Sequence, residues 1–255
     1  APADFQRLAS SFTVSLQPWQ EQLLFLRLMY KSTFRMPTFN DLYYYRLGNR
    51  SLRPEKANEY NMGITWSRSF SSFLNYLSVT VDGYYNDVTD KIVAFPTTYA
   101  WKMANYGKVH VTGMDATLAA AASLGKNMVL VVSGGYTWQK AIDLTDATSK
   151  SYKDQLPYTP KHSGNVSAVL EMPWVNVGYS IVGVSERYSM SQNIPENRID
   201  GYMEHTVSLS RNFSFRHCKL RLQAEIINLT DTQYDVIKYY PMPGRSWRLT
   251  GTIEF

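Results

Sequence analysis

Arg-Ser-Trp-Arg-Leu-Thr-Gly-Thr-Ile-Glu-Phe, residues 245–255, alternates apolar and polar side chains along its whole length. Successive side chains of an extended strand point to opposite faces. One face of this stretch is therefore apolar and the other polar; they carry Trp247, Leu249, Gly251, Ile253 and Phe255, against Arg248, Thr250, Thr252 and Glu254. A strand of ~9–11 residues with this alternation suits a transmembrane β-barrel, in which one face meets lipid and the other a wet lumen.

The same period of two recurs along the chain and predicts eleven strands, at residues 10–17, 23–31, 59–68, 76–86, 108–119, 127–137, 163–171, 175–184, 202–211, 218–227 and 245–255. In the tenth, Leu220, Leu222 and Ile226 share one face, whereas Arg221 and Glu225 share the other. Charged side chains need water, so both faces of such a strand cannot lie in a dry sandwich core. We therefore predict an all-β, up-and-down antiparallel transmembrane barrel, with the leucines toward lipid and the charges toward the lumen.

The connections between these stretches alternate in length. The short ones are residues 17–22, 69–75, 123–126, 172–174 and 212–217. The long ones are residues 32–58, 87–107, 138–162, 185–201 and 228–244. Outer-membrane barrels have short periplasmic turns and longer extracellular loops, whereas Greek-key connections mix lengths at both ends of a sandwich. The alternation therefore favours the barrel.

Composition agrees with a barrel and argues against other classes. Aromatic residues make up 14% of the 255 residues, which suits girdles at two membrane interfaces. The mean hydropathy is -0.30, and no apolar run is long enough for a transmembrane helix. The net charge of +5 comes from lysines and arginines scattered along the chain, so no nucleic-acid partner is expected.

The sequence offers no convincing metal site or enzyme active site. Cys218 is the only cysteine, which excludes an intrachain disulfide and a Cys-His zinc site. Asp143 and Asp146 fall short of the about six to eight oxygen ligands that calcium prefers. The chain has no Gly-x-Ser-x-Gly motif and no credible Ser/His/Asp arrangement. We expect a protein that is not an enzyme and needs no cofactor or metal.

The strand count predicts an incomplete barrel. If the last strand ends in the periplasm, counting back places the start of the first strand, near Ala9, at the extracellular rim. A closed single-chain barrel normally has an even number of strands and both termini in the periplasm. We therefore expect residues 1–255 to be the carboxy-terminal portion of a barrel of about 22 strands, whose first and last strands here do not pair with each other.

Two boxes in the sequence resemble those of TonB-dependent receptors. Residues 34–43 read Phe-Arg-Met-Pro-Thr-Phe-Asn-Asp-Leu-Tyr, and residues 48–55 read Gly-Asn-Arg-Ser-Leu-Arg-Pro-Glu. They are similar to the Phe-Arg-aliphatic-Pro and Asn-x-x-Leu-x-Pro-Glu segments of that family, with Met36 at the aliphatic position. Phe255 resembles the aromatic assembly signal of bacterial outer-membrane proteins. Further similar motifs follow in the family's order, at residues 105–107, 112–115, 156–160, 227–234 and 240–245.

The resemblance implies active import of a scarce, bulky nutrient across the outer membrane of a Gram-negative cell, with this chain integral to that membrane. A plug domain outside residues 1–255 would fill the lumen and bind the TonB complex. The lipid bilayer, a small-molecule ligand and a surface lipoprotein are the other expected partners. A passive outer-membrane porin is the alternative function, although a porin is not expected to carry the paired boxes.

The expected ligand is a corrinoid or a ferric siderophore, with haem less favoured. Haem importers of the family carry a histidine between the two boxes, whereas this chain has three tyrosines and an arginine there. Aromatic faces suit a bulky planar or macrocyclic ligand, and guanidinium groups pair with carboxylate or phosphate. The alternative is that these aromatic residues only pack loops together or belong to the interfacial girdle. The predicted ligand-binding residues are Tyr43, Tyr44, Tyr45, Arg46, Trp101, Tyr106 and Tyr158.

Overall fold

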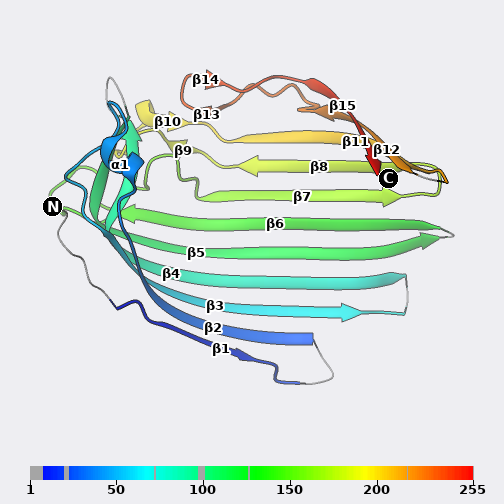
Figure 1. Cartoon of the computed structure of the whole chain (residues 1–255), viewed down its shortest axis with the longest axis horizontal. Helices are drawn as coiled ribbons and strands as arrows, with labels where there is room; N and C mark the ends of the chain where they lie inside the picture. The colour runs from blue at the N-terminus through cyan, green and yellow to red at the C-terminus, as the bar shows by residue number, and fades with distance from the viewer. Residues whose placement is uncertain are drawn as a thin grey trace.

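The computed structural model describes residues 8–19, 23–71, 73–96, 101–125, 127–216 and 218–254. They form one antiparallel sheet of 11 strands in the order β1-β2-β3-β4-β5-β6-β7-β8-β11-β12-β15 (Figure 1). The predicted up-and-down order is therefore confirmed. The strands are β1 Ser11–Leu16, β2 Leu23–Arg35, β3 Glu55–Ser69, β4 Leu74–Pro96, β5 Trp101–Gly125, β6 Met128–Asp143, β7 His162–Glu171, β8 Asn176–Val184, β11 Tyr202–Ser214, β12 Lys219–Ile227 and β15 Ser246–Glu254.

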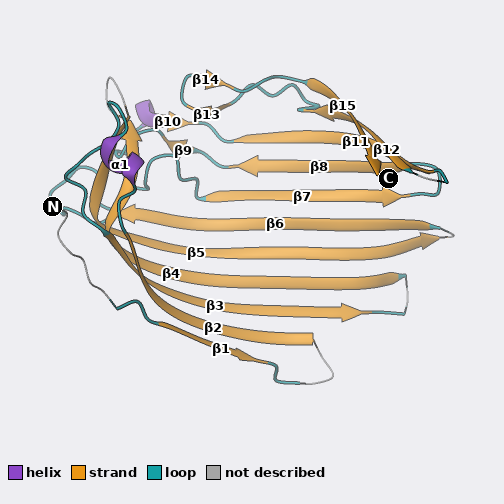
Figure 2. Cartoon of the chain, in the orientation of Figure 1, coloured by secondary structure: helices purple, strands orange, loops and turns teal. Residues whose placement is uncertain are grey.

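The remaining elements are short and lie in the long connections (Figure 2). They are helix α1 Phe39–Tyr43, the 3-10 helix η1 Pro195–Asn197, the strand pair β9 Arg187–Tyr188 with β10 Arg198–Ile199, and the strand pair β13 Asp235–Ile237 with β14 Tyr240–Pro241. The strand ends that the five predicted short turns join are at the opposite end of the sheet (Figure 1). None of the helices in the described ranges is both long and apolar enough to cross a membrane.

The register between neighbouring strands keeps apolar side chains on one face of the sheet, which we call the apolar face. Its pairs at the end of the chain are Leu220 with Ile253, Leu222 with Gly251 and Ile226 with Trp247. The opposite, polar face carries Arg221 and also Glu225, whose Oε2 accepts a hydrogen bond from Nε of Arg248 at 2.5 Å. The separation of the two faces expected from the sequence is confirmed.

The predicted loop at residues 87–107 is wrong, because both of its strands continue through it. β4 runs to Pro96, β5 begins at Trp101, and the two strands stay paired along this length. Asp90 and Lys91 interrupt the apolar alternation that marks lipid exposure. A strand outside the membrane meets water on both faces and needs no such alternation. The β4–β5 hairpin therefore extends past the membrane level, and the strict alternation of short and long connections fails here.

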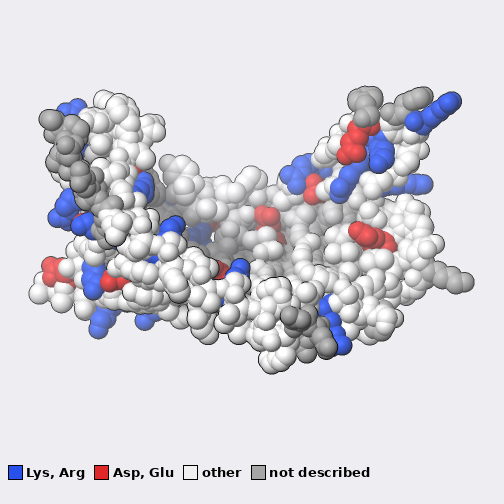
Figure 3. Space-filling view, turned by 60° about the horizontal axis from the view of Figure 1, so that its bottom comes forward, with Lys and Arg blue, Asp and Glu red and all other residues white. Residues whose placement is uncertain are grey.

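The sheet is open at β1 and β15, which do not pair with each other in the described residues. This agrees with the expectation for the first and last strands. β1 begins near the long-connection end, whereas the chain leaves β15 at the short-turn end (Figure 1). The molecule is hollowed, with acidic and basic side chains visible in the hollow (Figure 3).

Buried apolar side chains gather on the polar face near the long-connection end. Val109 is completely buried, and around it lie Ala57, Val88, Val111, Ala141 and Leu156. Leu156 belongs to the connection at residues 144–161, and its backbone N–H donates to the Ala141 carbonyl at 2.8 Å. This connection thus folds over the polar face, and its apolar contacts give the neighbouring loops a firm support.

Candidate ligand-binding site at the long-connection end

The first box builds a capped helical turn. The Asp41 backbone N–H donates to Oγ1 of Thr38 at 3.2 Å, and the Thr38 backbone N–H donates to Oδ2 of Asp41 at 2.9 Å. This reciprocal capping box satisfies N–H groups that the start of a helix leaves without partners. It fixes where α1 begins and buries the Asp41 side chain.

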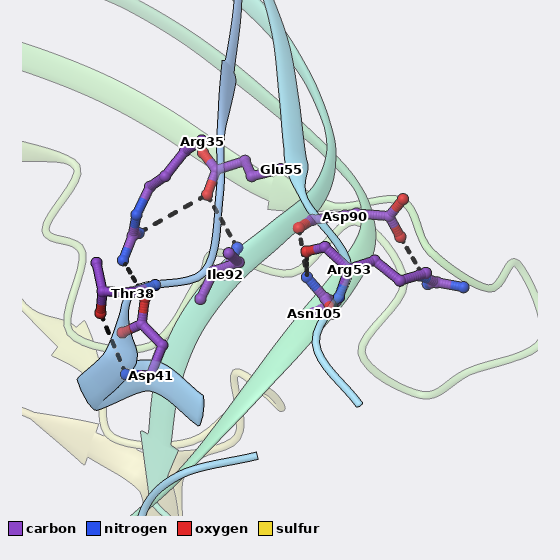
Figure 4. A network of polar contacts seen from close by, with 8 residues as sticks. All are labelled: Arg35, Thr38, Asp41, Arg53, Glu55, Asp90, Ile92 and Asn105. Atoms are coloured by element: carbon purple, nitrogen blue, oxygen red, sulfur yellow. Dashed lines mark hydrogen bonds and ion pairs between the residues drawn. The ribbon is translucent and has the colours of Figure 1, made fainter. Parts of the chain in front are cut away.

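Arg35 joins the two boxes by contacting an acid in each. Nη2 of Arg35 lies 2.8 Å from Oδ2 of Asp41, and Nη1 lies 3.9 Å from Oε2 of Glu55 (Figure 4). The same Glu55 oxygen accepts the Ile92 backbone N–H at 2.9 Å. Burial by itself raises the pKa of the Asp41 carboxyl, but the hydrogen bonds with Thr38 and the charge of Arg35 together hold this pKa below its usual value.

A second set of polar contacts fixes the other box to the β4–β5 extension (Figure 4). Nη2 of Arg53 lies 2.6 Å from Oδ1 of Asp90. Asn105 accepts the Arg53 backbone N–H at 2.9 Å and donates through Nδ2 to the carbonyls of Arg53 and Asp90, at 3.0 and 2.6 Å. These motif residues are engaged in holding the loop, and we assign them no ligand contact.

Apolar contacts complete the support beneath α1. Leu52, Ile92 and Met103 form a buried cluster, against which Leu42 and Leu47 pack from either side of the tyrosine segment. The Met103 backbone N–H also donates to the Leu47 carbonyl at 2.9 Å. The segment between the two leucines is therefore held against the extended hairpin.

The predicted tyrosines lie on this braced segment and face solvent. Tyr43, Tyr44 and Tyr45 are 50%, 60% and 79% exposed. The guanidinium of Arg46 lies 5.2 Å from the centre of the Tyr45 ring, and that of Arg50 lies 5.0 Å from the Tyr43 ring. A cation over a ring at such distances is favourable, and both groups remain open to a ligand.

Trp101 and Tyr158 meet from different parts of the chain. Their ring centroids are 5.6 Å apart and their planes are tilted by 33°. Burial raises the pKa of the Tyr158 hydroxyl, although a hydrogen bond with the Lys238 backbone and the charge of Arg187 act in the opposite direction. The Tyr158 hydroxyl is therefore harder to deprotonate than that of an ordinary tyrosine.

Tyr106 has a different setting from the other predicted residues. Its ring packs against the buried cluster around Val109, and its hydroxyl lies 2.8 Å from Oγ of Ser191. It links β5 to the connection at residues 185–201. The structure therefore places Tyr106 beneath the loops, where it positions them.

Two further tyrosine–lysine pairs lie in the long connections. Nζ of Lys153 is 5.3 Å from the centre of the Tyr152 ring, and Nζ of Lys238 is 5.5 Å from that of Tyr239. Tyr239 is 82% exposed. These four residues are not among the predicted ligand-binding residues; their only sequence signal is that each lysine adjoins its tyrosine. Tyrosine paired with a cation is thus a repeated feature of this end of the molecule.

The three histidines within the described ranges do not converge on a metal site. The hydroxyls of Tyr85, Tyr136 and Tyr179 lie within 3.3, 2.7 and 2.8 Å of a ring nitrogen of His110, His162 and His205, respectively. His217 lies outside the described residues. Across the described ranges, no three or more His, Cys, Asp or Glu residues come together closely enough to hold a metal ion.

The sheet, and the polar contacts that hold the two boxes in place, agree with the resemblance to TonB-dependent receptors. Residues 3–229 match the family model described as TonB dependent receptor-like, beta-barrel. The chain belongs to this family. It is 26% identical over 230 residues to the vitamin B12 transporter BtuB of Photobacterium profundum, and 26% identical over 231 residues to that of Vibrio vulnificus. Each alignment covers 87% of this chain but 34% and 33% of the relative, so the chain spans about a third of their length.

Solved structures of similar fold include two transporters and an import receptor. The unliganded ferric citrate transporter FecA has a TM-score of 0.73 and 15% identity, with coverage of 95% of this chain and 37% of FecA. The copper transporter OprC has a TM-score of 0.70 and 15% identity, with coverage of 96% of this chain and 38% of OprC. The closed form of the ferric-catecholate import receptor Fiu from K12 E. coli has a TM-score of 0.66 and 21% identity, with coverage of 95% of this chain and 34% of Fiu. At these identities the likeness shows the fold alone.

Family membership confirms the resemblance and the expected location. The chain is an integral β-barrel component of the outer membrane, so its apolar face meets lipid and its long connections lie at the extracellular end. A TonB-dependent receptor is favoured over a passive porin, since both boxes belong to the matched region. Phe255, the predicted assembly signal, lies outside the described residues.

Proposed function

We propose that this chain is part of a receptor that imports a scarce, bulky nutrient through the outer membrane, driven by the TonB complex. The proposal concerns a whole protein of which this chain spans about a third, as judged from its relatives. A plug domain would contact TonB from the periplasm. The bilayer, the small-molecule ligand and a surface lipoprotein are the other proposed partners; neither nucleic acid nor catalysis has a part.

The observation that carries the proposal is the group of exposed aromatic and cationic side chains on a braced support at the extracellular end. Tyr43, Tyr44, Tyr45 and Arg46 stand on the segment fixed by the two boxes. Ring faces bind apolar ligand surface, and a guanidinium pairs with carboxylate or phosphate. We propose that Trp101 and Tyr158 extend this surface and that Tyr106 supports it from below.

A corrinoid or a ferric siderophore is the proposed ligand class. The relatives named as vitamin B12 transporters support a corrinoid. The ring surface and the neighbouring arginines would equally suit an anionic iron chelate. Haem is less favoured, because residues 34–52 contain no histidine.

The test is ligand binding by the full-length receptor. A variant with Tyr43→Ala, Tyr44→Ala and Tyr45→Ala is compared with the natural protein, with cyanocobalamin and a ferric catecholate as probes. Loss of three aromatic contacts is expected to weaken binding of the cognate probe on the order of tenfold or more. Unchanged affinity with normal membrane insertion would reduce the segment to scaffolding.

Two controls separate binding from folding and from transport. Tyr179→Ala removes a tyrosine from the lipid-facing side of the sheet and is expected to leave ligand affinity unchanged. Uptake of the same probe in cells lacking TonB is expected to stop, whereas a passive porin would continue to conduct it.

A further inference from the structure

A repeated side-chain pair marks one level on the apolar face. Tyr85 of β4 directly faces Thr112 of β5, yet its hydroxyl contacts His110, two residues closer to the extracellular end. The rings of Tyr85 and His110 meet edge to face with centroids 5.4 Å apart. The contact is therefore diagonal across the hairpin, a separation that aromatic side chains can span.

The same diagonal recurs in the neighbouring extracellular hairpins. Tyr136 faces Gly164 but contacts His162, and Tyr179 faces Val207 but contacts His205. In the β2–β3 hairpin, Tyr30 faces Tyr60 and donates to Oδ1 of Asn58 at 3.4 Å, again two residues along. We call these four pairs the tyrosine belt. Amphipathic rings with hydroxyls satisfied in this way are typical of the membrane–water interface.

Lysines stand on the extracellular side of this belt, on the same face. Lys56 faces Thr89, and Thr89 in turn faces Lys108, so the three side chains form one row across β3, β4 and β5. Lys140 of β6 lies outside this row: it faces Thr112, the partner of Tyr85, and is four residues beyond Tyr136 toward the long connection. No ion pair joins any of these lysines to an acid within the described ranges. Lys56, Lys108 and Lys140, which we together call the lysine group, therefore present unneutralised positive charge where lipid headgroups begin.

One acid shares this region. Asp87 is on the apolar face between Asn58 and His110, and its Oδ1 lies 3.3 Å from Nε2 of His110. Asp87 thus lies beside the histidine of the belt, one row below Lys56 and Lys108. Its carboxylate does not bridge to either lysine.

We propose that the lysine group above the tyrosine belt binds the phosphate groups of phosphorylated lipid headgroups in the outer leaflet. A phosphate seated between Lys56 and Lys108 would accept hydrogen bonds from both ammonium groups and from the Thr89 hydroxyl, with Lys140 serving a second phosphate. Charge complementarity identifies the occupant, because juxtamembrane lysines attract anionic headgroups. The belt sets the depth, since its rings hold this level of the sheet at the interface.

The test measures lipid retention by the full-length receptor in detergent. Diphosphoryl lipid A and monophosphoryl lipid A are the probes, and native mass spectrometry gives their apparent affinities. The natural protein is expected to bind the diphosphoryl form more tightly. Each lysine near an anionic headgroup contributes roughly fivefold to affinity. A Lys56→Gln, Lys108→Gln, Lys140→Gln variant is therefore expected to bind the diphosphoryl form at least tenfold more weakly and to lose its preference for that form.

Matched variants keep the result interpretable. Lys150→Gln with Lys153→Gln removes two lysines from an extracellular loop and is expected to leave lipid binding unchanged. Thermal unfolding of each variant identifies folding defects, and millimolar inorganic phosphate is expected not to displace the lipid. Equal retention of both lipids by the natural protein, or unchanged binding by the triple variant, would overturn the proposal. Displacement by free phosphate would instead point to a site for the soluble ion and would also overturn it.

Discussion

The ring of Tyr84 lies directly over Gly113, its cross-strand partner in β5, so that a Cβ on Gly113 would be 2.3 Å from Cζ of Tyr84. Tyr84 packs in turn against the buried cluster around Val109. Gly113→Ala must therefore displace the ring from its packing. We expect the free energy of unfolding to fall by about 1–3 kcal/mol, as for other overpacked sites, when the full-length receptor is unfolded in urea.

Gly83→Ala is the matched control for this prediction, because Gly83 lies beside Tyr84 in the same strand. A Cβ at Gly83 would meet its nearest neighbour, the Met62 carbonyl oxygen, at 3.9 Å. This is ordinary contact, so we expect little change. Equal losses at both glycines would show that the Tyr84 ring is not the cause.

The two faces of β12 predict opposite responses to charge. Leu222 is on the apolar face, and Leu222→Arg would place a guanidinium against lipid at a cost of about 2–4 kcal/mol near the bilayer midplane. Arg221 is on the polar face, and Arg221→Leu is expected to be far milder. Folding free energies of the full-length receptor in lipid vesicles measure both. A larger loss for Arg221→Leu would reverse the assignment of the faces.

The strands could be predicted because a membrane imposes an alternation on each of them. Lipid accepts only apolar side chains and a wet lumen accepts charge, so residues such as Leu222 and Arg221 reveal their faces without any knowledge of tertiary structure. Outside the membrane, nothing imposes this alternation on a strand. Asp90 and Lys91 looked like loop residues because a strand in water on both faces carries no alternation, and the β4–β5 extension was missed.

The site was less predictable than the strands. The capping box of Thr38 and Asp41 has a local spacing that sequence reasoning could have used to place α1. The contacts of Asn105 with Arg53 and Asp90, however, join residues far apart in the chain, and no local pattern announces them. The diagonal tyrosine belt likewise depends on strand register, which single-strand periodicity leaves open.

At acid pH, protonation of Asp41 is expected to remove the stabilisation that its carboxylate gives to α1. The folded-state pKa of Asp41 is below the ordinary value of 3.8, so its stabilising effect is complete above that value and is lost as pH falls through the lower folded pKa. At neutral pH, Asp41→Asn should cost about 1.5–3 kcal/mol, the range for hydrogen bonds to a charged group. Urea unfolding of both proteins between neutral and strongly acidic pH should show this difference shrinking on the acid side.

Asp146→Asn provides the comparison for Asp41. Asp146 also has a lowered pKa, first because its side chain accepts the Thr148 backbone N–H and then because it accepts the Thr148 hydroxyl, but it lies in an exposed loop. We expect its substitution to leave the free energy of unfolding nearly unchanged, as for ordinary surface positions. A larger loss of stability for Asp146→Asn than for Asp41→Asn would mean that burial and the contact with Arg35 do not strengthen the contribution of Asp41.

Asn105 is expected to be more sensitive to loss of its amide than to loss of its size. Its Nδ2 donates to the carbonyls of Arg53 and Asp90, so Asn105→Asp would set a carboxylate oxygen against two carbonyl oxygens. Asn105→Ala removes the bonds without that repulsion and should cost about 1–3 kcal/mol. Proteolysis of the β4–β5 extension in the full-length receptor should be faster for Asn105→Asp than for Asn105→Ala. The opposite order would show that the amide is not what fixes this hairpin.

Trp101 and Tyr158 should act on ligand binding as one unit. Each ring is held by the other at 5.6 Å, so removal of either leaves its partner without the contact that orients it, worth about 0.5–1.5 kcal/mol. We expect Trp101→Leu and Tyr158→Leu each to weaken cyanocobalamin or ferric catecholate binding severalfold, and the double variant to be hardly weaker than either single one. Tyr158→Phe keeps the ring and should retain affinity, because the proposed contact needs the ring face and not the protonated hydroxyl. Strictly additive losses would mean that the two rings contact the ligand independently. Unchanged affinity in all of the variants would mean that the pair is only a packing contact between β5 and its neighbouring loop.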